Sequence, residues 1–217
     1  MELERREWEV DELEIRGTGD ERTVRGQAVP INRLSDDLGG FREVIRPGAV
    51  TESVKNNDIF LIWQHDTTQP ISRTTAKNHP LVVEERKPGV WFTQPAQAFT
   101  EFQLSKIDDG VVDKMSFGFF IEDREDEKWH EDQKPVLREI FKMNLMELSP
   151  VTFAAYQSTK VAVRSAAAHG VTLPEPVGDV RSVDARAVTF TPEEIQAHLE
   201  HEQEKIRLAV AQLGANG

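Results

Sequence analysis

Three residues, each in its own segment of the chain, have side chains that together could perform acyl transfer. His65 ends the hydrophobic segment DIFLIWQHD, Ser116 lies in MSFGFFI, and Glu147 lies in MNLMELSPVTF. Serine is a weak nucleophile at neutral pH, so an imidazole must take its proton while a carboxylate orients the ring and stabilises the imidazolium. A histidine, a serine and a carboxylate are therefore the set that base-assisted acyl transfer needs.

Taken singly, each of these residues also has an ordinary structural explanation. A histidine in a hydrophobic strand must find a polar partner, so a satisfied structural His65 fits as well as a catalytic one. Strand alternation puts Asp66 on the opposite face, which makes it a poor candidate for orienting that ring. Ser116 and Gly118 share a face and leave a pit where another backbone could approach, but small residues are also tolerated in crowded sheets. Glu147 either faces solvent, which is the default for a lone glutamate in a strand, or accepts a hydrogen bond from a donor such as an imidazole N–H.

The other five histidines offer little chemistry. His198 and His201 are three residues apart, a spacing compatible with a metal, but no further ligand lies near them. His169 falls in a predicted linker, and His79 precedes a proline in a loop. His130 lies in the charged loop EDREDEKWHED, which we interpret as a solvated hairpin tip. The chain has no cysteine, which excludes a disulfide framework, a thiolate zinc site and a cysteine nucleophile. We expect neither a metal nor a cofactor.

Charge and composition exclude several functional classes. The 217 residues include 26 Lys and Arg against 38 Asp and Glu, a formal charge of −12. A general nucleic-acid binder needs a positive surface, and so does docking on anionic lipid. No run of residues is apolar enough to span a membrane, and the first residues are too charged for a signal peptide. We expect a soluble protein that works inside a cell.

The elements that must position the three residues are mostly strands. Seven short segments rich in β-branched or aromatic residues are separated by Gly, Pro, Asn and Asp. They cover residues 21–31, 41–45, 58–66, 80–85, 89–96, 113–123 and 137–148. Residues 85–89 are expected to form a hairpin loop. Helices are expected over 49–56 and around 99–108. Six or seven strands with two short helices suggest a small barrel or a highly curved sheet.

The chain is expected to consist of a core domain, a linker and a terminal helix. Aromatic residues become scarce after Tyr156, so the core domain is placed at residues 1–164. Residues 165–190 are rich in alanine, glycine and proline and are interpreted as a flexible linker. Thr191 and Pro192 then supply an N-cap and a first helical residue, and apolar residues recur at helical spacing. The helix predicted over 191–217 is compatible with a weak coiled coil, with docking on a partner, or with a solvated amphipathic helix.

Five segments of the core, in order, resemble the prohead serine proteases of tailed phages. They are RGQAVPIN, FREVIRPGAVTESV, IFLIWQHDTTQPISRT, DKMSFGFFI and LMELSPVTFAAY, and the resemblance covers residues from about 20 to 164. Ser72 stands where the family usually has the glycine of P-I-G-R, and Ala154 and Ala155 stand where a proline is common. Neither departure touches the three residues, although Ser72 could alter the strand beside His65.

The resemblance implies a fold and a catalytic set. The family is related in fold to the herpesvirus assemblins, which implies a mainly β protein with a few helices, built as a small closed or curved antiparallel barrel. By position, Ser116 is implied as nucleophile, His65 as general base and Glu147 as third member. The herpesvirus branch uses a second histidine in the third role, for which His130 is the other candidate. Backbone N–H groups are expected in the oxyanion hole, with Arg73 as a candidate helper.

The resemblance also implies a function. A serine endopeptidase of this kind cleaves the scaffold protein or the N-terminal scaffolding segment of the capsid protein, inside the assembling procapsid in the host cytoplasm. Self-cleavage is expected between about residues 160 and 190, where Arg164, Arg181 and Arg186 precede small residues. The alternative is an inactive scaffold protein of the same fold. Partners are the capsid and scaffold proteins, with no nucleic acid and no membrane; a homo-oligomer stays open.

Overall fold

The computed structural model describes residues 3–9, 13–152 and 165–173. All of them belong to the first of two compact units, residues 1–175; the second comprises residues 176–217. The helix predicted over 191–217, and with it His198 and His201, therefore lies outside the described residues. The domain boundaries proposed from the sequence stay a prediction.

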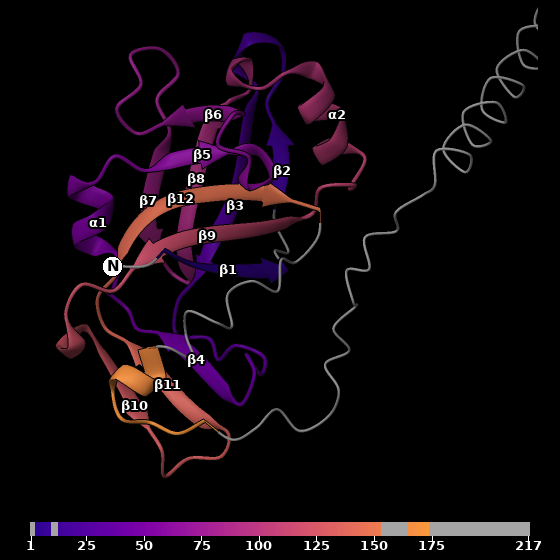
Figure 1. The fold of residues 1–217 in the computed structure, drawn as a ribbon. Helices are drawn as coiled ribbons and strands as arrows, with labels where there is room; N and C mark the ends of the chain where they lie inside the picture. Colours follow the sequence, from indigo (N-terminus) through magenta and orange to yellow (C-terminus); the bar gives the residue numbers. More distant parts are fainter. Residues whose placement is uncertain (1–2, 10–12, 153–164, 174–217) are drawn as a thin grey trace, which may run out of the picture. The chain divides into compact units, whose positions relative to one another are not determined.

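The described residues form a mainly β protein with few helices, as predicted, and the strands form three sheets (Figure 1). The five-stranded sheet has the order β1 (Glu4–Glu9), β9 (Lys114–Phe120), β12 (Asn144–Val151), β5 (Phe60–Ile62) and β6 (Pro70–Arg73). The four-stranded sheet has the order β2 (Leu13–Arg16), β3 (Thr23–Pro30), β8 (Gly89–Pro95) and β7 (Val82–Arg86). The three-stranded sheet has the order β10 (Glu127–His130), β11 (Val136–Ile140) and β4 (Phe41–Ile45).

The closed barrel expected from the sequence is not confirmed. In the described part of the chain each sheet keeps two edge strands, and β1 and β6 are the edges of the five-stranded sheet. The pairing is also not purely antiparallel, because β5 runs parallel to β12 and β4 runs parallel to β11. An open sheet must bury its apolar face against another layer. In Figure 1 the strands of the five-stranded sheet run across those of the four-stranded sheet.

Strand alternation explains how the core forms between these two sheets. Met115, Phe117 and Phe119 of β9 share one face and are buried in a single hydrophobic cluster with Val90 and Phe92 of β8. The opposite face of β9 carries the small residues. β9 lies between β1 and β12 and is buried along most of its length, so this second face is covered as well.

The two helices and the hairpin expected from the sequence are confirmed. Helix α1 spans Thr51–Asn56 and helix α2 spans Glu101–Asp108. Thr100 caps α2, since its hydroxyl accepts from the Gln103 N–H at 3.2 Å and the Gln103 side chain accepts from the Thr100 N–H at 2.9 Å. Single 3-10 turns lie at Gly19–Glu21, Trp63–His65, Ala96–Ala98 and Arg124–Asp126.

Several predicted segments differ in detail. The segment 58–66 is not one strand, because β5 ends at Ile62 and a turn follows. The segment 137–148 forms parts of two strands, β11 and β12, in different sheets. The loop around His130 is not a solvated tip, because Glu127–His130 is the strand β10, paired with β11. Strand β1 was not predicted at all, since its sequence ERREWE is mostly charged.

A buried ionic cluster explains how so charged a strand can pair. Arg138 of β11 is fully buried and donates to both oxygens of Glu4 at 2.7 and 2.8 Å, to Glu43 at 2.9 Å, and to Glu127. Arg6 donates to Glu4 at 2.7 Å and to Glu43 at 2.9 and 3.1 Å. Burial by itself would raise the pKa of Glu4, but the hydrogen bonds and charges of the two arginines outweigh it and hold the pKa below its usual value.

Residues 165–173, placed in the linker by the sequence, pack on the three-stranded sheet. Ala166 and Val171 are buried in a small cluster with Phe41 and Val136. The Ser165 hydroxyl donates to Glu127 at 2.7 Å. The linker predicted over 165–190 therefore begins with a packed segment, because two small alkyl side chains fill the space beside Phe41.

Candidate active site

A strained turn directly after β5 positions His65. Gln64 and His65 both have left-handed backbone angles, with φ of 54° and 59°, which non-glycine residues adopt only when their surroundings hold them there. The Gln64 side chain supplies that hold, since it donates to the Thr152 hydroxyl at 2.9 Å and accepts from the Thr152 N–H at 3.2 Å. Asp66 instead accepts from Thr68 at 2.6 Å, which agrees with its exclusion as the orienting carboxylate.

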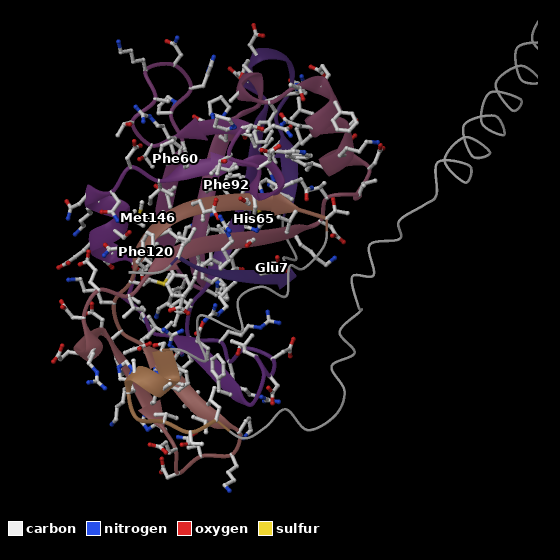
Figure 2. All side chains as sticks on the ribbon, viewed as in Figure 1. Glu7, Phe60, His65, Phe92, Phe120 and Met146 are labelled. Carbon is white, nitrogen blue, oxygen red and sulfur yellow. The ribbon has the colours of Figure 1, made fainter. Side chains whose placement is uncertain are left out.

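The turn brings the His65 ring to Glu147. His65 Nδ1 lies 3.1 Å from Glu147 Oε1, although the two residues are 82 positions apart in the sequence. Figure 2 shows His65 near the centre of the five-stranded sheet. An ionised carboxylate can only accept, so Nδ1 donates to Glu147, and in the neutral ring this leaves the lone pair on Nε2. Nε2 is buried and has no hydrogen-bond partner among the described residues.

Glu147 is buried, which corrects the default expectation that a lone strand glutamate faces solvent. It lies opposite Gly118, and a Cβ added at Gly118 would come within 2.6 Å of the Glu147 Cγ and 2.9 Å of its Oε1. The pit expected at Gly118 is thus filled by the Glu147 side chain. Arg5 Nε donates to the same Oε1 at 2.5 Å. Burial would raise the pKa of Glu147, but the hydrogen bonds from His65 and Arg5 outweigh it and lower the pKa.

Ser116 lies on the same face of the sheet but is not hydrogen-bonded to the imidazole. It is fully buried and pairs in register with Ser149 of β12 and with Glu7 of β1. Its hydroxyl donates to the Arg6 carbonyl at 2.9 Å. The Ser149 hydroxyl is buried without a partner among the described residues. The structure therefore joins His65 to Glu147 and places Ser116 on their face, with its hydroxyl turned toward β1.

The other residues considered from the sequence lie apart from this arrangement. His130 Nε2 contacts Glu139 in the three-stranded sheet, and Glu139 also pairs with Arg46. Arg73 of β6 pairs with Asp58 at 3.0 Å. Ser72 donates to a backbone carbonyl at 2.8 Å. Among the described residues no cluster of three or more His, Asp or Glu could hold a metal.

Two residues beside this arrangement were not singled out from the sequence, Arg5 and Ser149. Arg5 belongs to a charged segment that carries no strand signal, so nothing in the sequence linked it to Glu147. Ser149 had a usable signal, because it follows Glu147 by two residues and therefore shares its face in a strand.

The sequence matches the family described as caudovirus prohead serine protease over residues 7–172, more than half of the chain. The chain belongs to this family. No curated protein and no solved structure matches the chain.

Membership of this family gives the chain's general function. Serine protease activity and a part in phage capsid maturation are properties of the family. A prohead protease acts on capsid or scaffold proteins inside the procapsid. No helix among the described residues has the length and apolar character needed to cross a membrane.

Proposed function

We propose that this chain is a serine endopeptidase with Ser116 as nucleophile, His65 as general base and Glu147 as the third member. The observation that carries the proposal is the His65–Glu147 contact at 3.1 Å, which leaves Nε2 buried and free on the face that holds Ser116. Glu147 provides a negative charge beside Nδ1, since its pKa is lowered. These are the orientation and the charge that an imidazole needs in order to take a proton from serine.

The reaction follows from these roles. Rotation of the Ser116 hydroxyl away from the Arg6 carbonyl lets Nε2 accept its proton as Oγ attacks the scissile carbonyl carbon. The imidazolium is stabilised by Glu147 and then gives the proton to the leaving amine, which leaves an acyl-serine. Water, deprotonated by the same Nε2, attacks the acyl-serine and releases the carboxylate product and the free hydroxyl.

The substrates we propose are the scaffold protein and the N-terminal scaffolding segment of the major capsid protein. The enzyme acts inside the assembling procapsid in the host cytoplasm. We also propose that it cleaves its own chain between the core and the C-terminal residues. Family membership supports the setting.

The test is co-expression of the chain with the neighbouring capsid and scaffold genes, followed by sequencing of the capsid protein's N-terminus. Wild-type chain should produce a shortened capsid or scaffold protein, and Ser116→Ala should produce none. Ser105→Ala is the matched control, because the Ser105 hydroxyl only donates to a backbone carbonyl of α2 and lies away from the site. Cleavage by a folded Ser116→Ala chain would contradict the nucleophile. Uncleaved partners with every variant would favour an inactive scaffold protein.

A further inference from the structure

Strand β1 occupies the edge of β9, the strand that carries the proposed nucleophile. We infer that this edge is where an extended polypeptide substrate pairs, and that β1 is an internal occupant which must leave before the enzyme can act. The inference rests on the proposed function and adds to it a mode of substrate binding and a means of restraint.

The first support is the hydrogen bond of the nucleophile itself. The Ser116 hydroxyl donates to the Arg6 carbonyl, while His65 Nε2, the atom meant to receive that proton, has no partner among the described residues. A serine whose proton is held by a carbonyl oxygen is not activated. Ser116 is also fully buried, so no substrate carbonyl can reach Oγ in this arrangement.

The second support is the side chain of Arg5. Arg5 donates to Glu147 Oε1, the same oxygen that contacts His65 Nδ1. A guanidinium there partly neutralises the charge that should stabilise the imidazolium. One strand thus restrains two members of the triad, Ser116 through its backbone and Glu147 through a side chain.

The third support is the geometry of β1. It pairs antiparallel with β9, with Arg5 opposite Gly118 and Glu7 opposite Ser116. Figure 2 labels Glu7 on this edge strand. A peptide added to a sheet edge pairs in just this extended form, with its backbone supplying the affinity. The carbonyl oxygen of Arg6 faces the Ser116 hydroxyl, so β1 resembles a bound substrate held with its oxygen, not its carbon, toward the nucleophile.

Strand β1 is held firmly, so a competitor must be concentrated to replace it. Glu4 and Arg6 point to the other face and join the buried cluster around Arg138. Replacement requires that these charges leave their partners, which is costly for buried ion pairs. Crowding of scaffold and capsid segments inside a procapsid provides that concentration, and dilute enzyme stays restrained.

A cysteine lock tests the inference directly, since the chain has no cysteine of its own. The register pairs Glu9 of β1 with Lys114 of β9, so the double variant Glu9→Cys/Lys114→Cys can be oxidised to tie the two strands together. Cleavage of a peptide from the capsid processing site should be slowed roughly tenfold or more in the oxidised form, and reduction should restore it. The matched control is Arg16→Cys/Thr23→Cys, an equivalent antiparallel pair between β2 and β3, in which oxidation should leave the rate unchanged.

An oxidised lock that cleaves as fast as its reduced form would overturn the inference. Hydrogen exchange of the uncut wild-type chain gives a readout that does not depend on catalysis. Amides of residues 4–9 should exchange by local opening, faster than those of β12, and Arg5→Ala should speed them further. If β1 exchanges only with global unfolding, the inference fails. If no form cleaves the peptide although β1 opens locally, the proposed protease function is contradicted. The local displacement of β1 is then still supported.

Discussion

At the scale of single residues, the site depends on a carboxylate that is buried and still ionised. With β1 in place Glu147 stays charged because two donors, His65 Nδ1 and Arg5 Nε, share its Oε1, and the His65 donor remains when β1 leaves. The room for its side chain exists because Gly118 lies opposite. Two substitutions test the charge of Glu147 and the position of its side chain independently.

Removal of the charge should weaken catalysis without abolishing it. Glu147→Gln keeps the shape but cannot stabilise the imidazolium, so kcat/KM should fall by roughly 10²–10⁴-fold, less than for Ser116→Ala. Steady-state cleavage of a capsid-derived peptide measures this. His130→Asn is the comparison, because His130 contacts Glu139 in another sheet. Full activity of Glu147→Gln together with a crippled His130→Asn would assign the third role to His130.

A methyl group at Gly118 should displace Glu147. The Gly118→Ala Cβ would lie 2.6 Å from the Glu147 Cγ, so the carboxylate must move away from His65. We expect a loss of about 1–3 kcal/mol in the free energy of unfolding and a fall in kcat/KM. In a Glu147→Ala background the clash is absent. Gly118→Ala should therefore lower the free energy of unfolding less in that background than in the wild-type chain. Equal losses in the two backgrounds would show that Glu147 does not fill this space.

At the scale of elements, the buried ionic cluster joins β1 to the three-stranded sheet. Three carboxylates, Glu4, Glu43 and Glu127, face two guanidiniums, Arg6 and Arg138. Side chains from β1, β4, β10 and β11 meet there, so the cluster ties together strands from two sheets.

Loss of Arg138 should therefore be severe. Arg138→Met fills a similar volume but leaves carboxylates buried with too few donors, which typically costs about 3–5 kcal/mol. Urea unfolding followed by tryptophan fluorescence measures the change. Arg46→Met is the control, since Arg46 is half-exposed and pairs with Glu139, so its loss should cost at most about 1 kcal/mol. Similar losses for both variants would mean that the buried cluster is not a special source of stability.

At the scale of the whole molecule, the lowered carboxylate pKa values predict instability in acid. Glu4, Glu139 and Glu147 all have pKa values below their usual 4.5 in the folded chain. The unfolded chain then binds more protons than the folded chain in the interval between the two pKa values. Their stabilisation is present above about pH 4.5 and is lost as the pH falls through the folded values.

Unfolding free energies measured in urea from neutral pH down to about pH 3 should thus decline below about pH 4.5. Glu4→Gln removes one such group and should flatten the decline. A wild-type stability that stays level through this interval would contradict the lowered values.

Self-processing should remove the C-terminal residues. Residues 165–173 are packed, with Ala166 and Val171 buried, so this segment cannot enter a protease site unless it detaches. The sequence predicts cleavage between about 160 and 190, and the packing of 165–173 favours 174–190, where Arg181 and Arg186 lie. Intact mass should show wild-type chain trimmed in that range when concentrated or assembled with capsid protein.

A Ser116→Ala chain treated in the same way should stay at full length. Deletion of 188–217 should leave the core folded but lower the protease content of purified shells. A wild-type chain that keeps all 217 residues through maturation would exclude self-processing. Normal packaging of the truncated chain would exclude a recruiting role for the deleted residues.

Local sequence was enough to locate most elements and the three proposed site residues. β-branched and aromatic segments bounded by turn residues marked β3, β7, β8 and β9, and a helix was expected around residues 99–108, where α2 lies. These features depend on neighbours within a few positions, which is why periodicity and capping reveal them. The identities of Ser116, His65 and Glu147 came from residue types and motif order.

Tertiary structure decided everything that depends on distant partners. Strand β1 has no apolar alternation, and it is a strand because Arg138, more than 130 positions away, satisfies Glu4. His65 reaches Glu147 through a turn that is held by Thr152, 88 positions from Gln64. Strand pairing between segments so far apart cannot be recognised from the local hydrophobic pattern of either segment. The sequence alone therefore determined which groups are present, and only the packed sheets decided which atoms meet.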